Sequence, residues 1–422
     1  MKVTGEKMIE KNVVVLGAGI AGLSYAYNHT DEDVTIYEQN SYYGGLCHSF
    51  KVKDCTFDSA VHLSFTEDMR VREIFDKSDY ILHKPVSYNF YYGKWIKHPV
   101  INNIAPMEND FKTKCIVDFF ERDKDLIINN YSDYLLKAYG KSFKEKFYDV
   151  YTKKYWTVES QDLSTGWIGK RLPKVNNADI VRGSYEIMPR NDYYAREMRY
   201  PKGGNGFETF LNPLIENVNV QYNWKAVEID LGRKIILFDN GEYVHYQKLV
   251  TSVPLPELIE MTRNCPEIIR EQKEQLMYTK ISLVSVEVRK SYLMPYLWYY
   301  IYDEDIMAAR VNCPGIKCSD NVPAGMSSMQ FEIYHTKNER VDKDKIIQNT
   351  LYAIQKMNLC KDEDIAFIDY RLLPYGNVIY QLHMEKYRDR VIQYYEKQGI
   401  KLIGRFGRWE YFWSDQSFCS AI

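Results

Sequence analysis

Short apolar runs rich in β-branched residues recur along the first part of the chain, separated by a stretch with helical spacing. Val13 to Leu16 is one such run and predicts a buried parallel strand. Leu23 to Asn28 predicts the start of a helix, and Val34 to Glu38 predicts a second strand. We therefore expect residues 12–50 to form a βαβ unit, preceded by a polar lead-in over residues 1–11.

Three glycines lie between the first strand and the helix. Gly17, Gly19 and Gly22 have the G-x-G-x-x-G spacing. Gly17 allows a tight turn, Gly19 lets backbone approach a pyrophosphate, and Gly22 lets the helix pack on the strand. The N-terminus of the helix supplies free N–H groups and a positive dipole end for phosphates, and we expect Ile20 and Ala21 beside it to bind the cofactor. The pattern predicts a Rossmann-like dinucleotide-binding domain.

Two features after the helix indicate which dinucleotide binds. Glu38 ends the second strand, where a carboxylate that holds ribose hydroxyls is expected. Gly44 and Gly45, followed by Leu46, then let a second loop pass close to the cofactor. This arrangement is typical of FAD enzymes that resemble amine oxidases, protoporphyrinogen oxidases and sugar-nucleotide mutases. We expect FAD rather than NAD as the resident cofactor.

The pattern changes after this unit. Residues 88–104 begin with alternation around a Gly-Lys turn, which predicts a β-hairpin. Apolar residues recur at helical spacing over residues 111–155, Ile127 among them, and predict a helical insertion. Residues 225–254 alternate around an Asp-Asn-Gly turn and predict a small β-meander whose last strand returns to the nucleotide sheet.

The later part of the chain is richer in strands. Residues 281–335 and 365–384 have strand patterns, and residues 345–357 between them have helical spacing. A helix is expected to start over residues 207–214, after a glycine-rich loop. Residues 404–418 contain a glycine-rich turn, then aromatic residues and a final helix, a segment expected to return to cover the flavin.

These elements predict an α/β fold with three parts. It has a Rossmann-like FAD-binding domain, a helical insertion and a mostly antiparallel β-sheet substrate domain. We assign the FAD-binding domain to residues 1–87, 196–260 and 395–422, the helical domain to 105–195, and the substrate domain to 88–104 and 261–394.

Composition narrows the function classes. The 422 residues suffice for two or three domains. A net charge of −2 gives no electrostatic reason to expect nucleic acid or an anionic membrane as partner. No stretch reaches the roughly 18 apolar residues of a membrane span. The eight cysteines form neither C-x-x-C nor metal-ligand spacing, so we expect no metal and reduced thiols in the cytoplasm.

Short motifs are spread over most of the chain. Asp58 to His62 places small residues before a histidine, which suits backbone beside an isoalloxazine ring, although a core histidine is the plain alternative. Trp298 and Tyr300 precede Arg310, whose guanidinium is a fork for phosphate oxygens. The other motif segments are Trp95 to Ile104, Trp167 to Arg171, Tyr200 to Gly206, and Gly404 to Gln416.

In order and spacing, these motifs resemble those of UDP-galactopyranose mutases, especially the larger eukaryotic type, within the amine oxidase and protoporphyrinogen oxidase-like superfamily of FAD enzymes. The resemblance implies an isomerase, an intramolecular transferase that interconverts pyranose and furanose forms of a nucleotide-diphosphate sugar, as in galactofuranose supply for polysaccharide biosynthesis. It implies that FAD acts when reduced, its N5 being the nucleophile at the anomeric carbon, without net redox. NADH and NADPH are candidate reductants.

The resemblance also implies roles for individual residues. It makes His62, Arg171 and Arg310 catalytic, with the His62 backbone near the flavin N5. For the cofactor it adds His62, Gly404, Arg405, Asp415 and Gln416 to the glycine motifs and Glu38. For the substrate it implies Trp167, Arg171, Tyr300, Arg310, Tyr380, Tyr411, His98 and Asn102.

This chain departs from the family pattern at several positions. Ala60 and Val61 replace two glycines before the histidine, and Asp415 stands where an asparagine is usual. His98 lies where relatives have residues that hold uracil, so uracil and thymine both stay open, as do the sugar and a homo-oligomeric state. The alternatives are an FAD-dependent oxidase or desaturase of the amine oxidase type, and a non-enzymatic FAD-bound interaction protein.

Overall fold

The computed structural model describes residues 8–173, 175–190 and 195–422. A parallel layer begins with β1 (Ile9–Leu16), α1 (Ile20–Asn28) and β2 (Val34–Glu38), and β1 pairs in parallel with β2 and with β12 (Tyr243–Thr251). The expected lead-in is wrong where it is described, because Ile9 to Lys11 extend β1 along β12. Its residues 1–7 lie outside the described part of the chain.

The meander completes this nucleotide-binding sheet. Its strand order is β10-β11-β12-β1-β2-β9, and β18 pairs with β12. β10, β11 and β12 are antiparallel neighbours, as the turn signals predicted, and β12 then lies against β1. The added strands are β9 (Asn219–Tyr222), β10 (Ala226–Asp230), β11 (Ile235–Phe238) and β18 (Ile400–Leu402).

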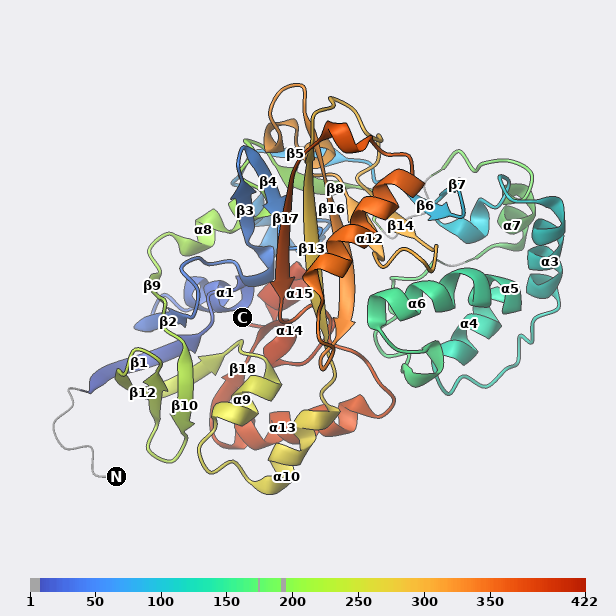
Figure 1. The fold of residues 1–422 in the computed structure, drawn as a ribbon. Helices are drawn as coiled ribbons and strands as arrows, with labels where there is room; N and C mark the ends of the chain where they lie inside the picture. Colours follow the sequence, from blue (N-terminus) through green and yellow to red (C-terminus); the bar gives the residue numbers. More distant parts are fainter. Residues whose placement is uncertain (1–7, 174, 191–194) are drawn as a thin grey trace.

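A second seven-stranded sheet stands above the first in Figure 1, in the order β17-β13-β16-β15-β14-β6-β7. All its pairs are antiparallel except β14 with β6. Its strands are β6 (Ser87–Tyr91), β7 (Lys94–Lys97), β13 (Thr279–Val288), β14 (Trp298–Ile301), β15 (Arg310–Asn312), β16 (Ser327–Thr336) and β17 (Ile365–Leu373). The predicted fold class is thereby confirmed.

The predicted strand region 365–384 is only partly correct. β17 ends at Leu373, and α13 (Met384–Lys397) begins at the end of that region. Pro374 cannot donate a ladder hydrogen bond, and the N–H of Gly376 instead donates to the carbonyl of Thr279 at 2.7 Å. The chain therefore leaves the sheet, and residues 374–383 form a connection that borders the cavity described below.

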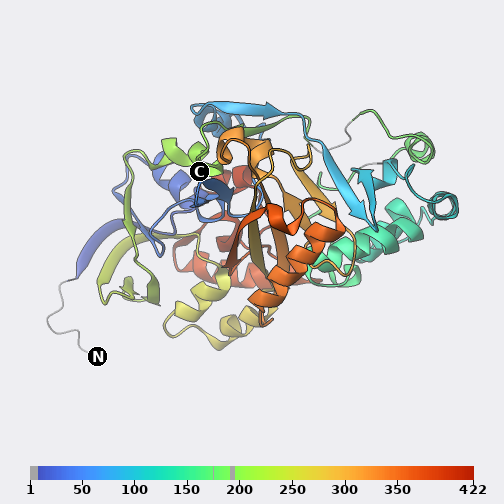
Figure 2. The same cartoon turned by 45° about the horizontal axis from the view of Figure 1, so that its top comes forward.

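The helical insertion lies beside the second sheet, next to the light-blue hairpin β6–β7 (Figure 2). Its α-helices are α3 (Asn109–Phe120), α4 (Tyr131–Tyr139), α5 (Lys141–Phe143), α6 (Asp149–Trp156) and α7 (Asn177–Gly183), with a π-helical turn over Lys144–Tyr148. The ammonium group of Lys154 on α6 donates to the carbonyls of Ile301 at 3.1 Å and Asp303 at 2.6 Å, which ties the insertion to the sheet. The expected helical role of Ile127 is wrong: α3 ends at Phe120, and Ile127 is 77% exposed.

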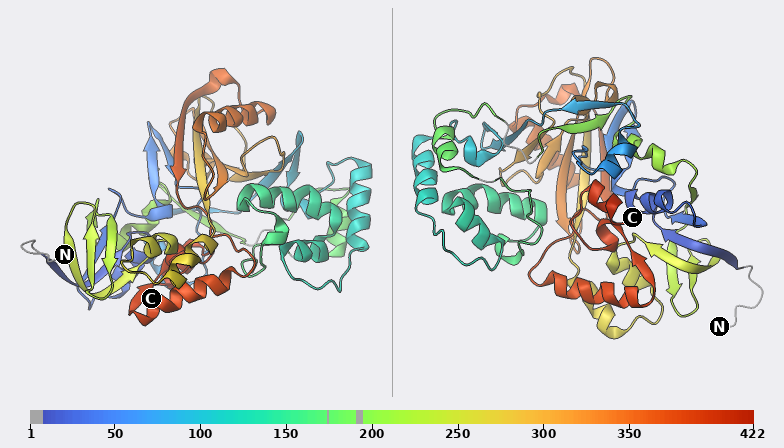
Figure 3. Two further views of the ribbon diagram at one scale, coloured as in Figure 1. Left: turned by 60° about the horizontal axis from the view of Figure 1, so that its bottom comes forward. Right: turned by 180° about the vertical axis from the view of Figure 1, so that it is seen from behind.

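Three helices pack together beside the nucleotide-binding sheet (Figure 3). They are α9 (Leu255–Met261), α10 (Glu267–Arg270) and α13, and α13 also contacts β18. The proposed boundaries at residues 260 and 395 stay a prediction, but these contacts favour grouping α10 and α13 with the nucleotide-binding sheet.

The remaining elements connect these layers. The predicted helix 345–357 is α12 (Lys343–Lys356), which packs on the second sheet, and the predicted final helix is α15 (Ser414–Cys419). Residues Phe207–Leu211 form a 3-10 turn before α8 (Asn212–Ile215). The others are β3 (Ser49–Val52), β4 (Cys55–Asp58), α2 (Met69–Phe75), β5 (Tyr80–His83), β8 (Met198–Pro201), α11 (Pro314–Lys317) and α14 (Gly404–Gly407). None of the helices in the described part of the chain has the length and the apolar character of a membrane-spanning segment.

Candidate active site

A cavity of about 600 Å³ is lined by residues of both sheets, the helical insertion and the C-terminal segment. At one end it is lined by the two glycine turns and Glu38, and at the other by side chains of α6, β14 and the 167–173 segment. Most of the site residues expected from sequence line it. They are Gly17, Gly19, Ile20, Ala21, Glu38, Gly44, Gly45, Leu46, His62, His98, Trp167, Arg171, Tyr300, Arg310, Gly404, Arg405 and Tyr411.

The two glycine turns run side by side at the edge of the cavity. The N–H of Gly44 donates to the carbonyl of Ala18 at 2.9 Å, and Gly44 has φ +95°. A Cβ on Gly45 would lie 3.3 Å from the Cα of Gly19, so the backbones approach as only glycine allows. Gly22 does not line the cavity. A Cβ there would lie 1.9 Å from the carbonyl oxygen of Gly17, which explains its role in helix packing.

Glu38 is held in a defined orientation beside these turns. Its Oε2 accepts a hydrogen bond from the N–H of Ala18 at 2.8 Å, and its Oε1 accepts from the N–H and the Nδ2 of Asn40 at 2.9 and 2.7 Å. The carboxylate and the N-terminus of α1 thus border the same space. A close-approach glycine cradle and helix N–H groups suit a pyrophosphate, and a fixed carboxylate suits ribose hydroxyls, so these residues fit a dinucleotide such as FAD.

The loop before His62 is anchored by the hydrogen bonds and the ion pair of Asp58. Buried Asp58 accepts from the N–H of Phe207 at 2.9 Å and from the hydroxyl of Ser49 at 2.8 Å, and it pairs with buried Lys317. After it, Ala60 adopts φ +77°, and His62 lines the cavity. Burial lowers the pKa of His62 to about 4, although nearby Asp58 opposes the shift. His62 is therefore neutral at pH 7.

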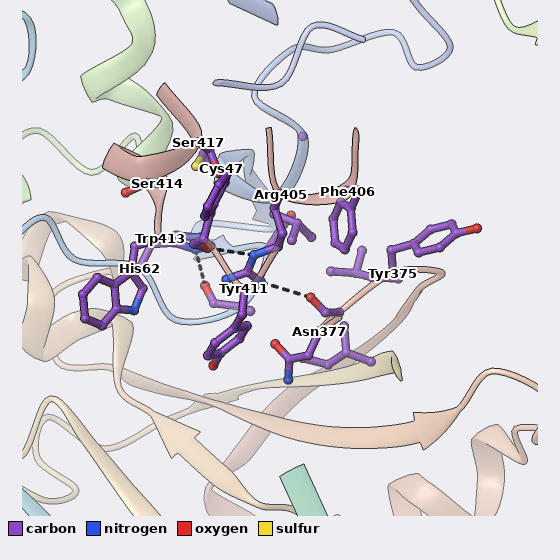
Figure 4. A pocket seen from close by; sticks show the side chains of 18 of the residues that line it. Cys47, His62, Tyr375, Asn377, Arg405, Phe406, Tyr411, Trp413, Ser414 and Ser417 are labelled. Atoms are coloured by element: carbon purple, nitrogen blue, oxygen red, sulfur yellow. Dashed lines mark hydrogen bonds between the residues drawn. The ribbon is translucent and has the colours of Figure 1, made fainter. Parts of the chain in front are cut away.

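Arg405 holds the C-terminal segment against the cavity. Its Nε donates to the carbonyl of Phe412 at 2.8 Å and its Nη1 to that of Gly376 at 3.1 Å (Figure 4). Asp415 and Gln416 do not line the cavity. Both are used at the start of α15, where Gln416 Oε1 accepts from the N–H of Trp413 at 2.9 Å and Asp415 Oδ1 accepts from the N–H of Gln416 at 2.9 Å. Ser414 and Ser417 line the cavity from this helix instead.

The other half of the cavity is aromatic and cationic. The Arg171 guanidinium donates to the carbonyls of Trp167 at 2.9 Å and Tyr411 at 2.7 Å, and it lies 4.2 Å from the ring centre of Trp413. The hydroxyls of Tyr155 and Tyr411 are 2.5 Å apart. Eight phenol side chains border this half: Tyr131, Tyr148, Tyr151, Tyr155, Tyr300, Tyr302, Tyr334 and Tyr411.

Arg310 faces this half from β15 but is paired with a carboxylate that sequence reasoning missed. Its Nε and Nη2 donate to Oε2 of Glu332 at 2.8 and 2.5 Å, and the side chain of Glu332 is fully buried. The signal was present in the sequence. Glu332 lies between Phe331 and Ile333 in β16, a strand that is buried on both faces, where an acid requires a buried partner.

Two expected substrate residues do not line the cavity. The hydroxyl of Tyr380 donates to Glu410 and accepts from the N–H of Tyr411 at 3.2 Å, so it supports the Tyr411 backbone. Asn102 is buried outside the lining. Asn377, which the sequence did not single out, lines the cavity near Arg405, and its Nδ2 has no hydrogen-bond partner among the described residues (Figure 4).

Across residues 8–173, 175–190 and 195–422, no group of three His, Cys, Asp or Glu side chains is placed to hold a metal ion.

Comparisons with known proteins place the fold. Residues 15–78 match the model of the NAD(P)-binding Rossmann-like domain. A UDP-galactopyranose mutase in its reduced state has TM-score 0.89 at 23% identity, covering 97% of this chain and 94% of that one. A structure described as a protoporphyrinogen oxidase from Exiguobacterium sp. has TM-score 0.72 at 15% identity, covering 99% and 98%. The resemblance expected from the motifs is thus confirmed for the fold.

Sequence comparison finds oxidases that are similar to part of the chain. The L-amino-acid oxidase of Crotalus adamanteus and apoxin-1 of Crotalus atrox are each 25% identical over 236 residues. That region is 52% of this chain and 45% of each oxidase, so the chain spans less than half the length of these curated relatives.

Proposed function

We propose that the protein is an FAD-dependent mutase that interconverts the pyranose and furanose forms of a nucleotide-diphosphate sugar. One observation carries the proposal. A single cavity has a dinucleotide cradle at one end and two arginines, Arg171 and Arg310, among eight tyrosines at the other. The first end fits FAD, and the second offers guanidinium and phenol donors for a pyrophosphate and aromatic faces for a base or sugar.

The cofactor half would hold FAD as follows. The glycine turns and the N-terminus of α1 would bind its pyrophosphate, and Glu38 its ribose. The backbone of residues 59–62 and of Ser414 would border the flavin. Reduced FAD, when bound, supplies a nucleophilic nitrogen for attack at an anomeric carbon, with no net redox over the cycle.

The chain's own residues would bind and orient the substrate. Arg171 cannot rotate freely, because two backbone carbonyls and the Trp413 ring fix it, so it presents a preorganised charge to the diphosphate. Arg310 adds oriented N–H donors. The hydroxyls of Tyr300 and Tyr411 are within the same lining and can donate to phosphate oxygens. The aromatic walls exclude water from the sugar.

An oxidase of the amine oxidase type is the second candidate. The partial match to L-amino-acid oxidases favours it. Against it, the Trp298–Tyr300–Arg310 spacing belongs to the mutase pattern, and Arg171 and Arg310 both face the substrate half.

The nucleotide stays a choice between uridine and thymidine. His98, whose ring centre lies 4.9 Å from that of Tyr300, borders the expected base site. All eight cysteines are free, which supports a reducing compartment such as the cytoplasm.

The deciding experiment is incubation of dithionite-reduced protein with UDP-galactose, UDP-N-acetylgalactosamine and dTDP-fucose, followed by chromatography for furanose products. A product that requires reduced flavin supports the proposal and names the sugar. The Arg171→Lys variant serves as control, and its binding of the same substrate should weaken about tenfold or more, since lysine cannot keep both carbonyl contacts. Absence of any product, with steady oxygen consumption on an amino acid or amine, would establish the oxidase instead.

A further inference from the structure

Glu332 is a buried side chain behind the substrate half of the cavity that accepts hydrogen bonds from three residues. We infer that it is a positioning residue, which fixes the cavity-facing edge of Arg310 and ties that arginine to the loop that carries His62. The inference rests on the proposed function for the identity of the ligand, a nucleotide diphosphate. The contacts that carry it are independent of any ligand.

The contacts of Glu332 reach three separate parts of the chain. Its Oε2 accepts from Nε and Nη2 of Arg310 at 2.8 and 2.5 Å and from the hydroxyl of Tyr334 at 2.9 Å. Its Oε1 accepts from the N–H of Val61 at 2.8 Å. Glu332 and its partner Arg310 come from neighbouring strands, where residue 310 pairs directly with residue 332. One buried carboxylate therefore joins β15, β16 and the 59–62 loop.

This pairing decides which part of Arg310 a ligand meets. Glu332 occupies the Nε–Nη2 edge, and Nη1 has no acceptor in the described part of the chain. A phosphate oxygen would therefore meet an oriented amino group, whose direction Glu332 sets. Because the carboxylate also compensates the guanidinium charge, the contribution of Arg310 is the direction of its N–H donors rather than a net positive charge.

The link to the loop explains why this position needs a carboxylate. An ionised carboxylate is acceptor-only, so it can receive Arg310 on one oxygen and Val61 on the other. A glutamine has only one acceptor oxygen, and its N–H₂ group would face a second donor, either the Arg310 guanidinium or the N–H of Val61. Glu332→Gln thus retains size and burial while it breaks one of the two connections.

The first arm of the test needs no ligand. Hydrogen–deuterium exchange of the purified full chain would be followed in peptides that cover residues 59–63. We expect faster exchange in Glu332→Gln than in wild type, because the N–H of Val61 loses its acceptor. Glu287→Gln is the matched control, since Glu287 is a buried glutamate of β13 in the same sheet without these partners. Unchanged exchange in this loop would overturn the link.

The second arm measures UDP binding by titration calorimetry on the FAD-loaded protein. A positioning role predicts weaker binding in Glu332→Gln, by about tenfold, and no further effect of this change in an Arg310→Met background. Removing a counter-charge alone would tighten binding, so tighter or unchanged binding contradicts the inference. Should Glu332→Gln fail to fold, Tyr334→Phe, which removes one donor to Glu332, replaces it in the exchange measurement alone, because Tyr334 itself lines the cavity. The expected exchange in residues 59–63 is again faster than in wild type, by a smaller factor.

The two proposals fail in different ways. If wild-type protein loaded with FAD binds neither UDP nor dTDP, the proposed function is wrong, and the exchange measurement still decides whether Glu332 holds the loop. If UDP binds normally and Glu332→Gln changes neither exchange nor affinity, the inference about Glu332 is wrong and the proposed function stands.

Discussion

At the scale of single residues, Ala60 carries backbone strain in the loop before His62. Its φ of +77° lies in the left-handed region, where a non-glycine residue costs about 1–2 kcal/mol. Glycine removes that cost but adds about 0.4–1 kcal/mol of unfolded-state entropy. We expect Ala60→Gly to raise the free energy of unfolding by about 0.5–1 kcal/mol, as measured by urea denaturation.

Val61 is the matched control for this prediction, because it is not among the positive-φ residues. Val61→Gly brings no relief of strain and should lower the free energy of unfolding. Equal destabilisation by both changes would mean that the strain at Ala60 is absent in solution.

His62 makes stability depend on pH. Burial lowers its pKa from 6.5 to about 4 in the folded protein. Between these values the unfolded chain binds more protons than the folded protein, so the free energy of unfolding falls as the pH drops through this window. Between pH 7 and about pH 5, we expect the free energy of unfolding to fall by up to about 2 kcal/mol less in His62→Gln than in wild type. Urea titrations at both pH values measure this difference.

One outcome would contradict the assignment of this effect to His62. A His62→Gln curve parallel to wild type would show that His62 is protonated equally in both states.

At the scale of elements, the turn between β1 and α1 separates cofactor binding from packing. A Cβ on Gly19 would fit sterically, since it would lie 3.9 Å from the Cα of Gly45. Gly19 lines the cavity, however, so this Cβ would lie where we expect the cofactor. A Cβ on Gly22 would lie 1.9 Å from the carbonyl oxygen of Gly17. We expect Gly19→Ala to keep the unfolding temperature of the apoprotein but to lose FAD, measured as the ratio of flavin to protein absorbance. Gly22→Ala should reduce the yield of folded protein itself.

The comparison of the two variants is the control. If Gly19→Ala binds FAD as wild type does, the pyrophosphate does not approach this turn. If Gly22→Ala folds normally, α1 can shift away from β1 at little cost.

At the scale of the whole molecule, the cavity joins parts that are distant in sequence. A ligand that spans it binds the folded state alone and stabilises it by about 2.7 kcal/mol at a free concentration about 100 times Kd. We expect FAD to raise the unfolding temperature of the apoprotein. NADPH, titrated in parallel by differential scanning fluorimetry, should give little or no shift. The reverse order would identify a resident nicotinamide dinucleotide, as the name of the matching domain model implies.

The local sequence pattern by itself determined many of the secondary-structure elements and turns of this protein. The β-branched runs, the three glycines and the turn signals predicted β2 with the observed bounds, the β1–α1 turn, the meander and the helical insertion. These features depend on neighbours within a few residues, where propensity and period carry the information. The spacing of Tyr300 and Arg310 likewise predicted residues that the structure places in one cavity.

Only the tertiary structure decided which groups meet. Glu332 and Arg310 pair because β15 and β16 are neighbours in register, and Val61 joins them from a loop far away in sequence. The chain turns at Gly376, so Asn377 lines the cavity and Tyr380 supports it from behind. Such contacts follow from register and burial across the whole fold, which no local period encodes.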